Sequence, residues 1–395
     1  MIPSIVQAAR LALALAPVWS LALAAACGEA RPASSQGAFE WGTATPESKG
    51  FSTAKLDALR AHLAEHRTKA FLLVRDDQIV YEWYAPGHSA TTPHFSASMA
   101  KALVGGMAVA VALNDGRLSL DDPAAKFIPQ WRRDPAKSRI TIRQLGSHSS
   151  GLDDSTDPEL AKDEIGGWKT DFWKVLAPPR DPFTLSRDQT PLLFAPGKGC
   201  QYSNPGIAML AYVTTAALKA APETDLRTLL RVRVMRQIGV PDDAWRVGYN
   251  KTIEVDGLPL VPAWGGGNYT ARASARIARL VLREGNWEGK QLIKPEAVRA
   301  VSSDAGLPGI YGIGWWSNSD GAIACLPRDA FLAVGAQQQV VLVLPSSRII
   351  VVRNGQAMTK IDPQDTARET LFLQPLMAAL GMDRSKVEKR ATASP

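Results

Sequence analysis

The order of apolar and polar residues predicts a helix and a hairpin near the start of the chain. Residues 52–66 carry apolar side chains at helical spacing, with a serine at the first position as an N-cap. Residues 70–84 contain two apolar, β-branched and aromatic runs around Asp76 and Asp77, a pattern typical of a hairpin. Residues 98–116 predict a buried helix that ends at an Asn-Asp-Gly stop.

The pattern changes towards the C-terminus. A long stretch of helical patterns broken by Pro and Gly gives way to short apolar runs that predict successive strands. An amphipathic helix at 273–285 precedes strands at 312–318, 321–327, 331–345 and 348–355, and a last helix follows at 365–380. Strands at both ends of the chain therefore indicate one antiparallel sheet flanked by helices. Beside it we expect a mainly helical subdomain, in an α/β (α+β) fold.

The first residues have the pattern of an export signal. A single positive residue, Arg10, precedes an apolar run that ends in three alanines before Cys27. The run is short for a membrane span and is interrupted by Pro17. We therefore expect a signal peptide at residues 1–26 and export to the periplasm. Cys27 lies where the lipidated cysteine of a bacterial lipoprotein would lie, so a cleaved and a lipid-anchored form both fit the sequence.

The remaining chain is organised, by this reasoning, as a linker, one large domain and a tail. We expect the linker at 27–44, the domain at 45–382 with its helical subdomain at about 115–260, and a disordered tail at 383–395. The 45 Lys and Arg residues against 38 Asp and Glu give a net charge of +7 without a dense basic block, which does not favour nucleic-acid binding.

The cysteines and histidines give no metal-ligand spacing. His62 and His66 lie four residues apart on the first predicted helix without a third ligand, so we interpret them as a surface pair and expect no metal and no cofactor. Because export permits disulfides, Cys200 and Cys325 could form one or could remain buried thiols.

One tetrapeptide carries candidate chemistry. Ser98-Met99-Ala100-Lys101 places a serine and a lysine three residues apart on a helix, where their side chains can meet. A serine hydroxyl becomes a nucleophile when a neighbouring base takes its proton, and a buried lysine with a lowered pKa can be that base. The alternative is a capping serine beside a surface lysine, and the apolar run that follows Lys101 argues against it.

Two further segments can complete such a site. Tyr202 could relay protons to and from the serine, and Asn204 could hold the lysine or a substrate amide, the alternative being a packed tyrosine and a helix cap. In the predicted strand, Gly335 allows close approach and the N–H of Ala336 could form an oxyanion hole with that of Ser98. A core strand with a glycine bulge is the alternative for that strand.

Together, the S-x-x-K, Y-x-N and glycine-containing strand motifs resemble, in this order, the serine β-lactamases and penicillin-binding proteins. The tyrosine in second place is similar to class C enzymes, and the long insert and the bulky Trp residues resemble the esterases and 6-aminohexanoate-dimer hydrolases of that family. The resemblance covers roughly residues 45–380. It implies an α/β region and an all-α region with the site between them, an acyl-enzyme mechanism, and neither metal nor organic cofactor.

One residue departs from the family pattern. The strand motif of the family usually begins with Lys or His, and here Ala333 takes that position. Without this cation the sequence favours a small neutral ester or amide as substrate, with Gln337 as an alternative polar contact. Two other functions stay open: a peptidoglycan D-amino-acid peptidase or weak β-lactamase, and a non-catalytic envelope binding protein.

Overall fold

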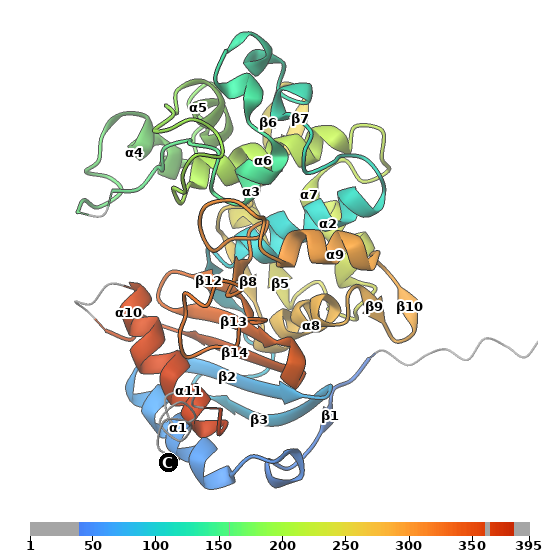
Figure 1. Ribbon diagram of the computed structural model, residues 1–395, viewed down its shortest axis with the longest axis vertical. Coiled ribbons are helices and arrows are strands. Elements are labelled where there is room, and N and C mark those ends of the chain that lie inside the picture. The colour runs from blue at the N-terminus through green and yellow to red at the C-terminus, as the bar shows by residue number, and fades with distance from the viewer. Residues whose placement is uncertain (1–38, 158, 360–363, 383–395) are drawn as a thin grey trace, which may run out of the picture. The chain divides into compact units, whose positions relative to one another are not determined.

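Seven strands form the central sheet of the protein, shown as a computed structural model in Figure 1. In spatial order they are β1 (Gly42–Thr43), β3 (Gln78–Tyr84), β2 (Thr68–Arg75), β14 (Ile349–Gly355), β13 (Gln339–Leu344), β12 (Phe331–Gly335) and β11 (Trp316–Ser317). All neighbours are antiparallel except β1, which runs parallel to β3. The pairing of β2 with β14 joins the two ends of the chain, which confirms the predicted sheet.

The structure describes residues 39–157, 159–359 and 364–382, and the expected signal peptide, Cys27 and tail lie outside these ranges. The compact unit begins at Phe39. Phe39 and Trp41 pack edge to face, with ring centroids 5.1 Å apart, and the next two residues form β1. Residues 39–44 therefore belong to the folded unit and not to the linker in which we expected them, because a two-residue strand leaves too short a pattern to recognise.

The sheet is covered on both faces by helices. Helix α1 (Thr53–Glu65) and the C-terminal helices α10 (Gln364–Arg368) and α11 (Gln374–Ala379) lie on one side, and α8 (Ala271–Leu282) covers the other. The apolar core has two parts, one on each face of the sheet. Successive residues of β2 point to opposite faces, so Leu73 packs with α1 and Leu72 packs in the cluster that contains α8. The predicted helices at 52–66, 273–285 and 365–380 and the hairpin at Asp76-Asp77 are thus confirmed.

The residues between the two halves of the sheet form the predicted helical region. Its centre is α2 (Met107–Asn114), which continues a π-helical segment at Lys101–Gly106, together with the buried helix α6 (Asn204–Ala217). Around them lie α3 (Ile142–Gly146), α4 (Gly167–Lys174), α5 (Pro182–Asp188), α7 (Leu226–Leu230) and α9 (Pro295–Ser302), a small sheet of β4 (His94–Ala97), β8 (Gly267–Tyr269) and β5 (Trp245–Arg246), and two hairpins, β6 (Ile253–Val255) with β7 (Leu258–Leu260) and β9 (Asn286–Trp287) with β10 (Lys290–Gln291).

Three predicted strands differ in the structure. The one expected at 312–318 is reduced to β11 at Trp316–Ser317. Residues 331–345 form two strands, because Gln337 and Gln338 adopt φ values of 63° and 53° and turn the chain. Residues 321–327 form a loop, so the strand predicted there is wrong. The side chain of Asn318 holds that loop by donating to the carbonyls of Ile323 and Leu326 at 3.1 and 3.2 Å, contacts that an apolar pattern does not reveal.

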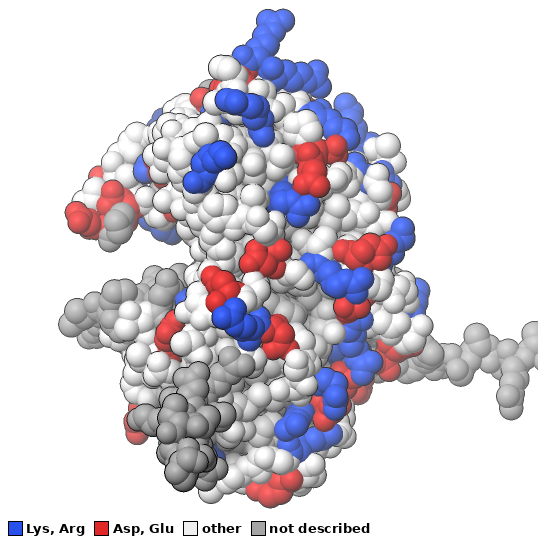
Figure 2. All heavy atoms as spheres, in the orientation of Figure 1, with Lys and Arg blue, Asp and Glu red and all other residues white. Residues whose placement is uncertain are grey.

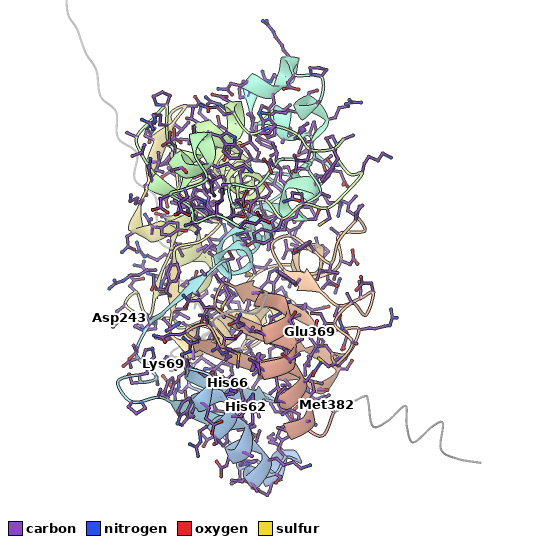
Figure 3. All side chains as sticks on the ribbon, turned by 90° about the vertical axis from the view of Figure 1, so that its left-hand side faces the viewer. His62, His66, Lys69, Asp243, Glu369 and Met382 are labelled. Atoms are coloured by element: carbon purple, nitrogen blue, oxygen red, sulfur yellow. The ribbon has the colours of Figure 1, made fainter. Side chains whose placement is uncertain are left out.

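The histidine pair on α1 has a structural role. His62 Nε2 lies 2.8 Å from the carbonyl oxygen of Leu371 and so joins α1 to the C-terminal helical segment, whereas His66 Nδ1 lies 2.8 Å from the carbonyl oxygen of His62 at the end of the same helix (Figure 3). Within the described residues no cluster suited to a metal ion occurs, and no helix has the length and apolarity to cross a membrane. Cys200 and Cys325 are not joined by a disulfide.

Basic and acidic side chains are interspersed on the face shown in Figure 2. The molecule is hollowed on the left of this view, between the helical region and the sheet region. In Figure 1, α4 lies above this hollow and α10 lies below it.

Candidate active site

Ser98 follows directly on strand β4, at a sharp change of chain direction. The preceding residue, Ala97, has a φ of 48°, a left-handed conformation that is uncommon for a residue with a Cβ atom. Strand β4 pairs with β8, and Ser96 Oγ donates to the carbonyl of Gly267 at 3.0 Å, which fixes the strand just before the turn. Ser98 is thereby held between a strand and the π-helical segment that begins at Lys101.

Lys101 places its amine on the serine, as the tetrapeptide predicts. Its Nζ lies 3.1 Å from Ser98 Oγ, 2.7 Å from Asn204 Oδ1 and 2.8 Å from the main-chain oxygen of Trp264. A neutral amine can donate to the two carbonyl oxygens and present its lone pair to the serine proton. The two carbonyl contacts therefore orient the amine for proton abstraction.

The environment of Lys101 favours the neutral amine. Only 2% of this residue is exposed. Burial lowers the pKa of Lys101 from 10.5 to about 7; the carboxylate of Asp154 opposes this effect and the cation of Lys162 adds to it. A large fraction of the molecules thus carries an unprotonated Lys101 near neutral pH.

Asp154 is a part of the site that the sequence analysis missed. Its Oδ1 accepts hydrogen bonds from the main-chain N–H and the side-chain Nδ2 of Asn204, at 2.7 and 2.9 Å, and Oδ2 accepts one from Thr156. Because Asn204 Nδ2 is bound to Asp154, Asn204 must turn its Oδ1 towards Lys101. Ser203, and not Asn204, is the N-cap of α6.

Tyr202 brings its hydroxyl to Ser98 and forms a hydrogen bond with it. Burial raises the pKa of this phenol well above its usual value, so Tyr202 keeps its proton at neutral pH. Its ring lies 4.6 Å from Lys101 Nζ and stacks on His148 with centroids 4.6 Å apart. Burial and the nearby Lys101 lower the pKa of His148 to about 3, so this histidine is a neutral support for the tyrosine.

The end of strand β12 passes close to the serine turn, as predicted. A Cβ atom on Gly335 would lie 2.2 Å from the carbonyl oxygen of Ser96, so only glycine allows this approach. Gly335 and the exposed Ala336 both line the pocket that contains Ser98. Gln337 does not line it, because the turn directs this exposed residue away, and Gln338 takes that place.

A pocket of about 370 Å³ opens at Ser98 between the helical and sheet regions. Aromatic side chains and two cations dominate its wall. The lining residues are Ser98, Thr156, Lys162, Trp173, Tyr202, Asn204, Tyr311, Trp316, Val334, Gly335, Ala336, Gln338 and Arg368. Ala333 is fully buried in the core and is absent from this lining, so position 333 offers the pocket no polar group.

Replacing Gly335 by alanine is expected to reduce activity at least tenfold and to destabilise the fold by about 1–3 kcal/mol, since the new methyl group would displace β12 from Ser96. Gly105→Ala is the matched control, because a Cβ atom there would meet Ala263 at an ordinary 3.7 Å. Ester hydrolysis and thermal melting measure both effects. Equal activity of the two variants would contradict the role given to Gly335.

The fold and the site define a protein with a Ser-Lys-Tyr cluster at the base of a pocket between a helical region and a sheet, and comparison with known proteins agrees. The β-lactamase family model matches residues 56–374, and the chain belongs to this family. A 6-aminohexanoate-dimer hydrolase of Paenarthrobacter ureafaciens is 25% identical over 253 residues, which are 62% of this chain and 60% of that protein. The chain spans less than two thirds of the length of the curated relatives it matches.

Solved structures share the fold at low sequence identity. A penicillin-binding protein homolog from Caulobacter crescentus aligns with a TM-score of 0.59 and 17% identity, over 83% of this chain and 99% of that one. A family VIII carboxylesterase aligns with a TM-score of 0.60 and 15% identity, over 85% and 99%. The fold is therefore that of the β-lactamases and penicillin-binding proteins, and the similar proteins include a 6-aminohexanoate-dimer hydrolase and a carboxylesterase.

Proposed function

We propose that this protein is a serine hydrolase that cleaves a small ester or amide through an acyl-enzyme on Ser98. One observation carries the proposal: Lys101 Nζ and the Tyr202 hydroxyl both contact Ser98, while Lys101 is buried with a lowered pKa. A binding protein has no chemical need for a neutral lysine oriented on a serine hydroxyl.

In the first half of the reaction, neutral Lys101 takes the proton of Ser98 as its Oγ attacks the carbonyl carbon of the substrate. The main-chain N–H groups of Ser98 and Ala336 stabilise the oxyanion of the tetrahedral intermediate. Tyr202 donates its proton to the leaving group and regains one from Lys101, and the acyl-enzyme remains on Ser98. The close approach of Gly335 to Ser96 brings the end of β12, which carries the second oxyanion donor, to the serine turn.

In the second half, a water molecule attacks the acyl carbonyl in the same oxyanion site. Neutral Lys101 takes one proton from that water. Tyr202 donates its proton to Ser98 Oγ as the acyl bond breaks and regains one from Lys101, so that Ser98 leaves as a hydroxyl. Asn204, held by Asp154, keeps the lysine in place through both halves. Every proton transfer is thus assigned to a side chain that contacts Ser98 or Lys101.

We further propose that the protein acts outside the cytoplasm. The apolar run before Cys27 supports export to the periplasm, and Cys27 supports a lipid anchor as one form of the mature protein. Both proposals are tested by the mass of the N-terminal peptide from the native host. A peptide that begins after residue 26 supports cleavage, and a diacylglyceryl mass on Cys27 supports the anchor.

Two other functions make different predictions. A peptidoglycan D-amino-acid peptidase or weak β-lactamase would be acylated by a labelled penicillin at Ser98. A non-catalytic binding protein would hydrolyse no substrate. The missing cation at Ala333 argues against the peptidase or β-lactamase, whose substrates carry a carboxylate. The same missing cation favours the non-catalytic binding protein.

Incubation with p-nitrophenyl butyrate, followed by a rapid acid quench and peptide mass analysis, tests the proposed function. We expect release of p-nitrophenol over many turnovers and a butyryl group on the peptide that contains Ser98. Labelling by penicillin alone, without ester turnover, would favour the peptidase. No turnover and no adduct on Ser98 would favour the binding protein and contradict the proposal.

A further inference from the structure

The charged groups that line the pocket are both positive. Among the described residues the lining includes Lys162 and Arg368 and no carboxylate. The carboxylate nearest to the reaction, Asp154, is buried and is engaged by Asn204 and Thr156. The pocket therefore has a positive wall, although Ala333 supplies no cation from strand β12.

Lys162 is held at the pocket by contacts with α4. Its main-chain oxygen accepts a hydrogen bond from Thr170 Oγ1 at 2.9 Å, and its Nζ lies 3.4 Å from the ring centroid of Trp173. The indole of Trp173 is fixed in turn, because its Nε1 donates to the carbonyl of Ser155 at 2.9 Å. The exposed lysine is thus placed by a cation–π contact on the pocket wall.

This ammonium group has no close anion of its own. Within the described residues, Lys162 forms no ion pair shorter than 4.0 Å, and the electrostatic partner that acts on it is Asp154. Lys169 and Lys174, its neighbours on α4, are instead paired with Asp153 and Asp171 at 2.9 and 3.4 Å. Lys162 can therefore accept an anionic group without breaking an existing pair.

We propose that Lys162 binds a carboxylate on the substrate, so that the pocket accepts anionic esters or amides. This inference rests on the proposed function, and it replaces the neutral substrate that Ala333 alone favours. The cation comes from the helical region beside α4 instead of from strand β12, and the carboxylate would lie against Trp173 with the reacting carbonyl at Ser98. A charge-assisted hydrogen bond of this kind contributes about 1.5–3 kcal/mol, or roughly a tenfold to hundredfold preference.

Two matched pairs of substrates test this inference. The mono-p-nitrophenyl ester of succinic acid and p-nitrophenyl butyrate differ in a carboxylate on the acyl side. The compounds 4-acetoxybenzoate and methyl 4-acetoxybenzoate differ in a carboxylate on the leaving group. For each pair, the ratio of kcat/KM for the anionic to the neutral ester is measured at low ionic strength.

We expect Lys162→Met to lower this ratio at least tenfold in one of the two pairs, and Lys162→Arg to retain it. Lys174→Met is the matched control, because it removes one positive charge from the same segment at a side chain that does not line the pocket. The ratio should also fall in the unchanged protein as salt is added, since ions screen exposed charges.

An unchanged ratio in both pairs for Lys162→Met would overturn the inference. If kcat/KM fell equally for anionic and neutral esters, the ratio would be unchanged. Lys162 would then act on Lys101 and not on the substrate. A lower ratio in Lys174→Met as well would assign the effect to general charge, which also overturns it. Failure of the proposed function is distinguishable, since no ester would then be hydrolysed and Ser98 would carry no acyl group.

Discussion

Replacing Ser98 by alanine or Lys101 by methionine is expected to lower kcat/KM for ester hydrolysis by on the order of 10³–10⁶ in each case. The double variant should lose no more than roughly the worse of the two single variants. The reason is that Lys101 has its effect only by removing the proton of Ser98, from 3.1 Å away, so that without the serine the lysine has no proton to take.

The measurement is a double-variant cycle with p-nitrophenyl butyrate, with Ser96→Ala as the control. Ser96 Oγ donates to the carbonyl of Gly267 and takes no part in the proton transfers of Ser98, Lys101 and Tyr202, so its loss perturbs only the position of the strand and should cost less than tenfold in activity. Additive losses in the double variant would show that the two residues act independently. Near-normal activity of Lys101→Met would show that another group is the base.

Thermal unfolding of Lys101→Met shows whether the variant is folded. It also shows whether burial of Lys101 lowers the stability of the unchanged protein. The pKa of Lys101 is about 7 in the folded protein and 10.5 as its ordinary value, so between these values the unfolded chain holds a proton that the folded chain lacks. The stability of the unchanged protein therefore rises with pH across this window. The melting temperature of Lys101→Met relative to that protein should fall from pH 7 to pH 10, and a constant difference would contradict the lowered pKa.

Local patterns in the sequence were sufficient for most helices and for the hairpin. The periodicity of α1 and the Asp76-Asp77 turn depend on neighbouring residues, so each can be recognised from a short window. The loop at 321–327 could not be recognised, because hydrogen bonds from Asn318 replace strand pairing there. The start of the fold at Phe39 depends on a strand pairing with β3, more than thirty residues away along the chain, which no local pattern contains.

The candidate site also combines residues that the sequence reveals with contacts that it does not. Ser98 and Lys101 follow from helical spacing, and the structure brings Tyr202 and Asn204 to them from a distant segment, as the order of motifs predicts. The oxygen of Trp264 belongs to the main chain, which carries no residue-specific signal. Asp154 lies in a segment that resembles the family, and a second acidic residue beside it concealed which carboxylate would be buried.

Lys162 could not be identified from the sequence, because neither its spacing nor a motif distinguishes it from the other lysines of the chain. It becomes a candidate only when α4 places Trp173 under its ammonium group and the pocket lining is known. Substrate charge in this fold can thus be set by a residue far in sequence from the strand motif. The alanine at position 333 is consistent with a cation that comes from Lys162 instead of from the strand motif.

The activity should depend on pH through a single ionisation on the acid side. Hydrolysis of p-nitrophenyl butyrate is expected to rise in kcat/KM about tenfold per pH unit below pH 7 and to level off above it, because only neutral Lys101 can take the proton of Ser98. The two other titratable groups that contact the cluster do not interfere in this range. Burial keeps His148 neutral with a pKa of about 3, and the raised pKa of Tyr202 keeps the phenol protonated.

Charged groups around the lysine give this profile a specific signature. Asp154 raises the pKa of Lys101 and Lys162 lowers it, so Asp154→Asn should move the midpoint of the acid limb downwards and Lys162→Met should move it upwards. The profiles are measured with a neutral ester, so that substrate charge does not contribute. A midpoint that moves in the same direction in both variants, or a flat profile between pH 5 and 8, would exclude Lys101 as the ionising base.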